Sequence, residues 1–139
     1  FYGVLDTTTQ TLRYANAGHN PALLHRRGSD ALELLKATGP PLGVMEGMEF
    51  EQCSIRVEPG DTVVLYTDGV TEARDLDGEL FGSERLRELI LEHAGQSCRA
   101  LADTISDALA QFTIGLDEID DLTVLVVRMA EEATEAEAE

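Results

Sequence analysis

Basic residues are scarce in this sequence. Its 10 lysines and arginines face 27 aspartates and glutamates, which gives a formal net charge of −17 at pH 7. A nucleic-acid-binding surface needs clustered lysine and arginine opposite the phosphates, so the composition argues against one. Cysteine is rare as well, and Cys53 and Cys98 lack the spacing of a zinc or redox motif. Two thiols do not make a disulfide framework, and we therefore expect a reducing, cytoplasmic setting.

Long hydrophobic runs are also missing. No stretch is long and apolar enough to cross a membrane, and Phe1–Leu5 is typical of a strand rather than of a secretory signal. The first residue is not methionine, so we expect a fragment or a processed chain. What is present is the composition of a folded protein, 43% hydrophobic and 27% charged, in a length that suits one domain. We place this domain at residues 1–129 and treat residues 130–139, rich in alanine and glutamate, as an acidic tail.

Hydrophobic periodicity predicts an α+β fold in which strands come first, then two helices, then a last strand. The segments of strand character are Phe1–Leu5, Thr11–Asn16, Pro21–His25, Glu49–Val57, Thr62–Tyr66 and Leu122–Val127. By pattern alone, Ala31–Leu35 suits either a strand or a helix. Ser83 and Ser97 are the expected N-caps of the two helices, since a serine hydroxyl can accept a hydrogen bond from a free backbone amide.

Acidic residues stand where two of these apolar strands meet a turn. Asp68 follows Thr62–Tyr66, whereas Asp120 and Asp121 precede Leu122. If the two strands are neighbours, their carboxylates converge at one edge of a sheet, and such a cluster needs a cation to relieve its repulsion. Taken alone, the motifs have plainer interpretations, an ordinary Asp-Gly turn and a solvated loop. An unrelated calcium-binding domain is a further alternative, although the sequence has no EF-hand loop.

Five motifs in a fixed order resemble a known family. They are Tyr14–Pro21, Gly39–Gly43, Pro59–Asp61 together with Leu65–Ala73, Phe81–Gly82, and Asp120–Thr123. This order is similar to that of the metal-dependent serine/threonine phosphatases related to protein phosphatase 2C, in particular their bacterial sporulation and stress-response branch. The resemblance implies an antiparallel β-sandwich flanked by helices on both sides (α-β-β-α), here truncated at its N-terminus.

The resemblance implies a chemistry as well. Members of this family hold two Mn²⁺ or Mg²⁺ ions at the edge of the sandwich, where a metal-activated water attacks the phosphorus of phosphoserine or phosphothreonine. Carried over by motif, Asp68 and Asp120 are the expected metal ligands. Asp121, where the eukaryotic relatives often have asparagine, is expected either to support the ligands or to act as an alternate ligand. The expected substrate is a phosphorylated regulatory protein, such as an anti-sigma-factor antagonist.

The segment Gly18-His19-Asn20 differs from the eukaryotic relatives, which usually have an acidic residue after the glycine. His19 could contact the phosphate or protonate the leaving group, or it could brace the turn before Pro21, and we favour the structural interpretation. Asn20 is a candidate substrate contact. Gly18 and Gly69 are expected to shape the backbone beside the site.

The sequence has no counterpart of the acidic Gly-Asp motif that the family carries well upstream of Tyr14–Pro21 and that supplies a bridging metal ligand. We therefore expect the chain to hold metal weakly and to have little phosphatase activity alone. The alternative is a phosphatase-like module that binds a partner without turnover. Apolar sheet edges left open by the truncation favour a homodimer that shields them.

Overall fold

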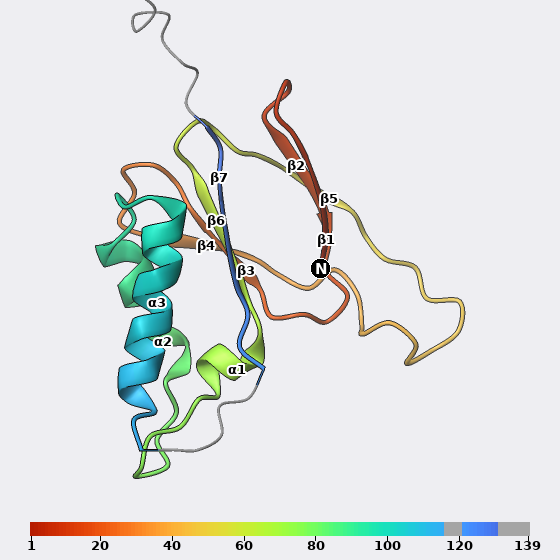
Figure 1. Ribbon diagram of the computed structural model, residues 1–139. Helices are drawn as coiled ribbons and strands as arrows, with labels where there is room; N and C mark the ends of the chain where they lie inside the picture. The colour runs from red at the N-terminus through yellow and green to blue at the C-terminus, as the bar shows by residue number, and fades with distance from the viewer. Residues whose placement is uncertain (116–120, 131–139) are drawn as a thin grey trace, which may run out of the picture.

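The protein forms two packed antiparallel sheets, as seen in a computed structural model that describes residues 1–115 and 121–130 (Figure 1). One sheet has the strand order β1-β2-β5 and the other the order β4-β3-β6-β7. The strands are β1 (Tyr2–Asp6), β2 (Thr11–Ala15), β3 (Ala22–His25), β4 (Leu32–Leu35), β5 (Cys53–Arg56), β6 (Thr62–Tyr66) and β7 (Val124–Arg128). This arrangement confirms the predicted α+β sandwich.

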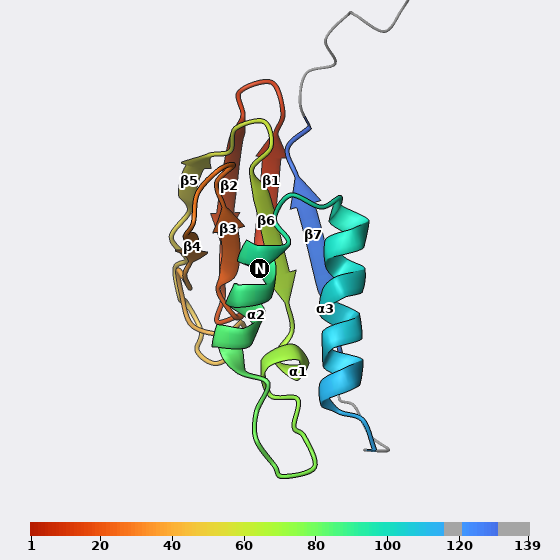
Figure 2. The same cartoon turned by 90° about the vertical axis from the view of Figure 1, so that its left-hand side faces the viewer.

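Both long helices lie on the outer face of the four-stranded sheet, which Figures 1 and 2 show from two sides. They are α2 (Gly82–Glu92) and α3 (Cys98–Phe112), and a single helical turn, α1 (Asp68–Thr71), follows β6. Over the described ranges, the outer face of the three-stranded sheet carries no helix. None of the helices in this part of the chain is long and apolar enough to cross a membrane.

Two strand predictions are sharpened by the pairing. The ambiguous segment Ala31–Leu35 contains a strand, since Leu32–Leu35 pairs antiparallel with β3. The alternating segment Glu49–Val57 is shorter than predicted, because only Cys53–Arg56 reaches β2 and pairs with it. A two-residue alternation therefore marks this segment correctly but does not tell where its partner strand ends.

The helix starts agree with the sequence in one case and not in the other. Ser97 caps α3 as predicted, with its hydroxyl oxygen accepting a hydrogen bond from the amide of Ala100 at 3.2 Å. The prediction of Ser83 as a cap is wrong, because α2 begins at Gly82 and Phe81 holds the N-cap position. The buried Phe81 ring packs edge-on against Phe112 at a centroid distance of 5.3 Å. Packing between helices, rather than a side-chain cap, thus fixes where α2 starts.

Apolar residues cover both faces of the four-stranded sheet, which explains why β6 has an almost unbroken apolar sequence. Val64 and Tyr66 pack on the helix side, whereas Val63 and Leu65 face the other sheet. The helices present the stripes predicted from spacings of three and four residues. Their fully buried members are Leu86, Ile90, Leu101, Ile105 and Leu109. β6 is therefore held by packing on both faces, which fixes the point where the chain leaves the strand toward Asp68.

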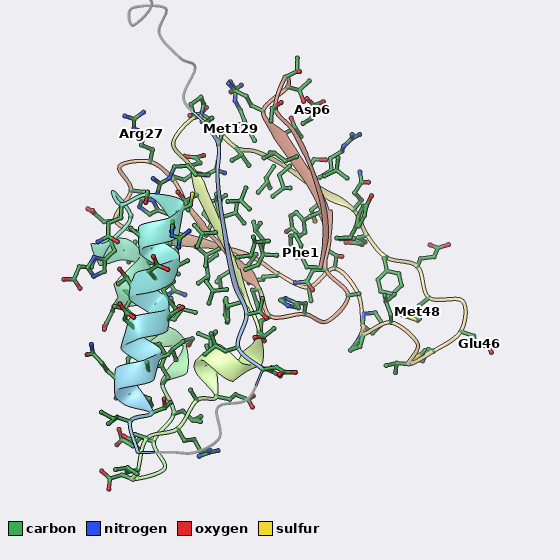
Figure 3. All side chains as sticks on the ribbon, viewed as in Figure 1. Phe1, Asp6, Arg27, Glu46, Met48 and Met129 are labelled. Carbon is green, nitrogen blue, oxygen red and sulfur yellow. The ribbon has the colours of Figure 1, made fainter. Side chains whose placement is uncertain are left out.

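A buried carboxylate fixes the other end of β6. Asp61 is 3% exposed and accepts hydrogen bonds from the amides of Arg27 and Glu58 at 2.9 and 3.0 Å. The Arg26 guanidinium also donates to the Asp61 carboxylate, at 2.9 Å. Burial alone would raise the pKa of Asp61, but these hydrogen bonds and the Arg26 charge outweigh it, so the pKa lies below its ordinary value. Figure 3 labels Arg27 at this end of the sandwich, away from α1.

An apolar groove opens between the two sheets along strands β1 and β7. It encloses about 270 Å³, and its lining residues include Phe1, Leu5, Leu125, Val127 and Met129. Phe1 and Met129 are labelled in Figure 3. β1 pairs only with β2, and β7 only with β6, within the described residues. Leu125 is consequently 52% exposed although it points toward the inter-sheet space.

Candidate active site

The two acidic segments meet at one edge of the four-stranded sheet, as predicted for neighbouring strands. β6 and β7 run antiparallel and their last register pair is Tyr66 with Val124. The residues that follow β6 and those that precede β7 therefore leave the sheet at the same edge. Asp68 and Asp121 lie on these two segments. Asp120 falls outside the described residues, so its predicted role as a ligand is not tested.

Thr67 joins these two segments directly. Its amide donates to the carbonyl of Thr123 at 3.1 Å. Its hydroxyl accepts a hydrogen bond from the Thr123 amide and donates one to the Asp121 carbonyl, both at 2.9 Å. This role of Thr67 was not predicted from the sequence. The available signal was its place between a buried strand and an Asp-Gly pair, where threonine oxygen commonly bonds to backbone.

Asp68 opens helix α1 rather than the simple tight turn that an Asp-Gly pair suggests. Thr67 is the N-cap of this helix, and the carbonyl of Asp68 accepts from the amide of Glu72 at 2.8 Å. One carboxylate oxygen, Oδ1, accepts from the Gly69 amide at 3.0 Å, and the side chain is exposed. Gly69 is buried within α1 and its φ is not in the left-handed region, so conformational freedom is not its role here.

A buried amide side chain shapes the loop that faces Asp68. Asn16 is completely buried, with its Oδ1 accepting from the His19 amide at 2.8 Å and its Nδ2 donating to the His19 carbonyl at 3.0 Å. Its backbone carbonyl accepts from the amides of Thr38 and Gly39. These bonds close the 16–19 turn and tie it to the chain after β4. Asn16 lies in the Tyr14–Pro21 motif, but its role in the turn was not predicted.

Gly18 has a physical reason to be glycine. Its φ is +77°, in the left-handed region, and a Cβ at this position would lie 2.7 Å from a ring carbon of Pro41. The backbone of the 16–20 loop thus approaches the Pro41 ring closely. Any side chain at residue 18 would push the loop and the Pro41 segment apart.

These loops and strand ends enclose a small hollow at the sheet edge. It has a volume of about 200 Å³, and its lining residues are Gly18, His19, Asn20, Thr67 and Asp68. The structure therefore brings four of the predicted residues together and connects Asp121 to them through Thr67. Within residues 1–115 and 121–130, no group of three or more histidine, cysteine or acidic side chains is arranged to hold a metal ion.

The His19 ring has a defined neighbour. Its Nδ1 lies 2.9 Å from the carbonyl oxygen of Asn20. A carbonyl oxygen only accepts hydrogen bonds, so this contact assigns the proton to Nδ1 in the neutral ring. Nε2 is then the nitrogen that can accept a proton or, once protonated, donate one. The backbone of His19 braces the turn through Asn16, so the residue has a structural role whatever its ring does.

The chain is similar to known bacterial regulators over most of its length. The family model described as Stage II sporulation protein E (SpoIIE) matches residues 1–130. Protein IcfG of Synechocystis sp. is 36% identical over 128 residues, which cover 91% of this chain and 20% of that protein. Phosphoserine phosphatase RsbU of Bacillus subtilis is 32% identical over 128 residues, or 92% of this chain and 38% of that protein.

Solved structures share the fold. The SiaA-PP2C domain of Pseudomonas aeruginosa superposes with a TM-score of 0.72 at 26% identity, covering 89% of this chain and 48% of that one. The RsbU and RsbW domains of Rv1364c from Mycobacterium tuberculosis give a TM-score of 0.67 at 29% identity, covering 91% of this chain and 34% of that one. The chain thus spans less than half the length of each of these relatives.

Proposed function

The chain belongs to the SpoIIE family of PP2C-type phosphatase domains, and we propose that it carries part of a metal-dependent site for dephosphorylating phosphoserine or phosphothreonine in a regulatory protein. The observation that carries this proposal is the sheet edge where Asp68, the Thr67 bridge to Asp121, and the His19-Asn20 loop meet. The relatives are much longer than this chain, so the substrate and the partner are part of the proposal.

The donor set at this edge fits Mn²⁺ or Mg²⁺. Both ions prefer hard oxygen ligands, and carboxylates from adjacent segments supply them. Asp68 is the exposed first residue of α1, and Asp121 is an exposed residue that precedes β7. By sequence, Asp120 would add a third carboxylate. A divalent ion held there would lower the pKa of a coordinated water and would offset the charge of the phosphoryl oxygens.

The residues of the hollow would orient the phosphate. The Asn20 amide can donate to a phosphoryl oxygen, and a protonated His19 Nε2 can donate either to such an oxygen or to the departing seryl oxygen. The Nδ1 contact with the Asn20 carbonyl links the orientation of the two residues. Gly18, which has no side chain, leaves the hollow open. These roles require the bound phosphoprotein to reach the sheet edge with its phosphoserine extended.

The proposed partner is a phosphorylated regulatory protein such as an anti-sigma-factor antagonist. Support comes from the relatives, one of which is called phosphoserine phosphatase RsbU and another of which carries RsbU and RsbW domains. The two free cysteines, Cys53 and Cys98, agree with a proposed cytoplasmic location, since thiols stay reduced there.

A phosphopeptide assay tests the activity. We expect slow, Mn²⁺-dependent phosphate release that chelation with EDTA abolishes, with a turnover number below about 1 s⁻¹, the lower end of the usual range for enzymes. The rate is expected to be low because the sequence has no counterpart of the acidic Gly-Asp motif from which the family takes a bridging metal ligand. Release that persists in EDTA would contradict the metal-dependent mechanism. Mn²⁺ binding without any release would favour a partner-binding module instead.

The inter-sheet groove supports the proposed homodimer. Its apolar lining lies between two edge strands, β1 and β7, each of which leaves one side without a strand partner in the described structure. A second copy placed against this side would cover Leu125 and Val127, which are 52% and 37% exposed. Sedimentation equilibrium should then give twice the chain mass at micromolar concentration, and Leu125→Lys should shift the chain to monomer. A wild-type monomer at high concentration would rule out the dimer.

A further inference from the structure

Thr67 extends the β6–β7 ladder by means of its side chain. The regular register ends at Tyr66 and Val124, and the Thr67 amide still reaches the Thr123 carbonyl. Beyond this point the hydroxyl takes the place of backbone groups, accepting from the Thr123 amide and donating to the Asp121 carbonyl at 2.9 Å each. The amide and the hydroxyl of Thr67 thus both join the 121–123 segment to the end of β6.

Thr67 lies between the two segments that carry Asp68 and Asp121. Asp68 follows Thr67 directly, and Asp121 is the residue whose carbonyl the hydroxyl holds. Two carboxylates brought to the same sheet edge repel each other, and a cation bound between them relieves the repulsion. A hydroxyl that holds the backbone of both segments therefore limits how far the two carboxylates can separate before any cation binds, so less free energy is needed to organise the site.

We infer that Thr67 is a positioning residue that sets the separation of Asp68 and Asp121 for a divalent cation through its two side-chain hydrogen bonds. The inference rests on the proposed function, since it names a residue that serves the same cation site. Both side-chain hydrogen bonds of Thr67 require a hydroxyl group. Serine keeps both hydrogen bonds, whereas valine has nearly the same shape as threonine and makes neither.

The strand pair offers a matched control at its opposite end. Thr62 is buried on the same strand and its hydroxyl oxygen accepts a hydrogen bond from Arg128 Nε on β7 at 2.8 Å. Thr62→Val therefore also removes a threonine hydroxyl that bridges β6 and β7. It does so at the end away from Asp68, so it should lower the melting temperature without acting on the acidic edge.

Two measurements on each variant test the inference. The first is the hydrogen-exchange rate of the Thr123 amide in the metal-free chain, measured by NMR. The second is the dissociation constant for Mn²⁺, measured from the free-ion signal in electron paramagnetic resonance. Thr67→Val should speed exchange at Thr123 about tenfold and weaken Mn²⁺ binding about tenfold or more, whereas Thr67→Ser should stay within about twofold of wild type in both. Thr62→Val should change neither.

The outcomes separate this inference from the proposed function. Unchanged Thr123 exchange in Thr67→Val, unchanged Mn²⁺ affinity in that variant, or an equal loss of affinity in Thr62→Val each overturns the positioning role while the metal site stands. A wild-type chain that binds no Mn²⁺ overturns the proposed function, and the positioning role with it.

Discussion

Replacing Asp68 with asparagine should weaken Mn²⁺ binding by about tenfold or more, because the substitution keeps the shape of the side chain and removes its negative charge. Asp68 is the first residue of α1 and lies two residues after β6, a strand that is packed on both faces, so the protein does not need to move it into place. The Gly69 amide bonds only Oδ1, and Oδ2 accepts no hydrogen bond within the described residues. That oxygen is therefore available to a cation.

The matched control for Asp68→Asn is Asp107→Asn. Asp107 is exposed on α3, and its replacement changes the net charge of −17 by the same single unit. A strongly acidic chain attracts divalent cations non-specifically, and this control measures that contribution. Titration with Mn²⁺ at about 0.15 M salt, where long-range attraction is screened, compares the two variants. Equal affinities in both variants would show that Asp68 is an ordinary surface carboxylate.

Replacing Asn16 with alanine should lower the free energy of unfolding by about 2–4 kcal/mol, because two strong side-chain hydrogen bonds are lost and their backbone partners remain in a partly buried turn. Those partners are the amide and the carbonyl of His19, at 2.8 and 3.0 Å. Because the same bonds shape the 16–19 turn, we also expect the His19 and Asn20 signals to shift in the NMR spectrum. Unfolding in urea measures the first effect.

Asn20→Ala is the control for Asn16→Ala. Asn20 is partly exposed at the hollow, and only its backbone carbonyl takes part in a hydrogen bond within the described structure. Its truncation should change stability by less than about 0.5 kcal/mol. A loss of less than 1 kcal/mol in Asn16→Ala, about the effect of a single ordinary hydrogen bond, would mean that the turn does not depend on this amide.

The sequence predicted most strands because burial leaves a short-range pattern. The apolar run Thr62–Tyr66 and the stripes of α2 and α3 can be read without knowing their partners. Asp68 and Asp121 could be placed at strand ends in the same way. The sequence did not show whether these two strands are neighbours. The β6–β7 pairing in the structure shows that they are.

The residues that hold the site together were not predictable, since their partners are distant in the chain. The Thr67 hydroxyl bonds to the Asp121 carbonyl across 54 residues, and the backbone amide of Asn16 bonds to the Thr38 hydroxyl across 22. A threonine or asparagine at a strand end gives no local sign of such a partner. The start of α2 at Gly82 was missed for a similar reason, because the contact of Phe81 with Phe112 depends on the packing of α3. The phosphatase interpretation came from the ordered motifs, not from the pattern of burial.

The most direct test of the metal site is to locate bound Mn²⁺ by paramagnetic broadening of backbone amide signals. The ion broadens signals of nearby nuclei, so its position can be found even when binding is weak. At low Mn²⁺ concentration, the account predicts that the signals of residues 18–20, 67–69 and 121–123 disappear first and that Asp68→Asn restores them. Broadening centred on the acidic residues 131–139, unchanged in Asp68→Asn, would contradict a cation site at the β6–β7 edge.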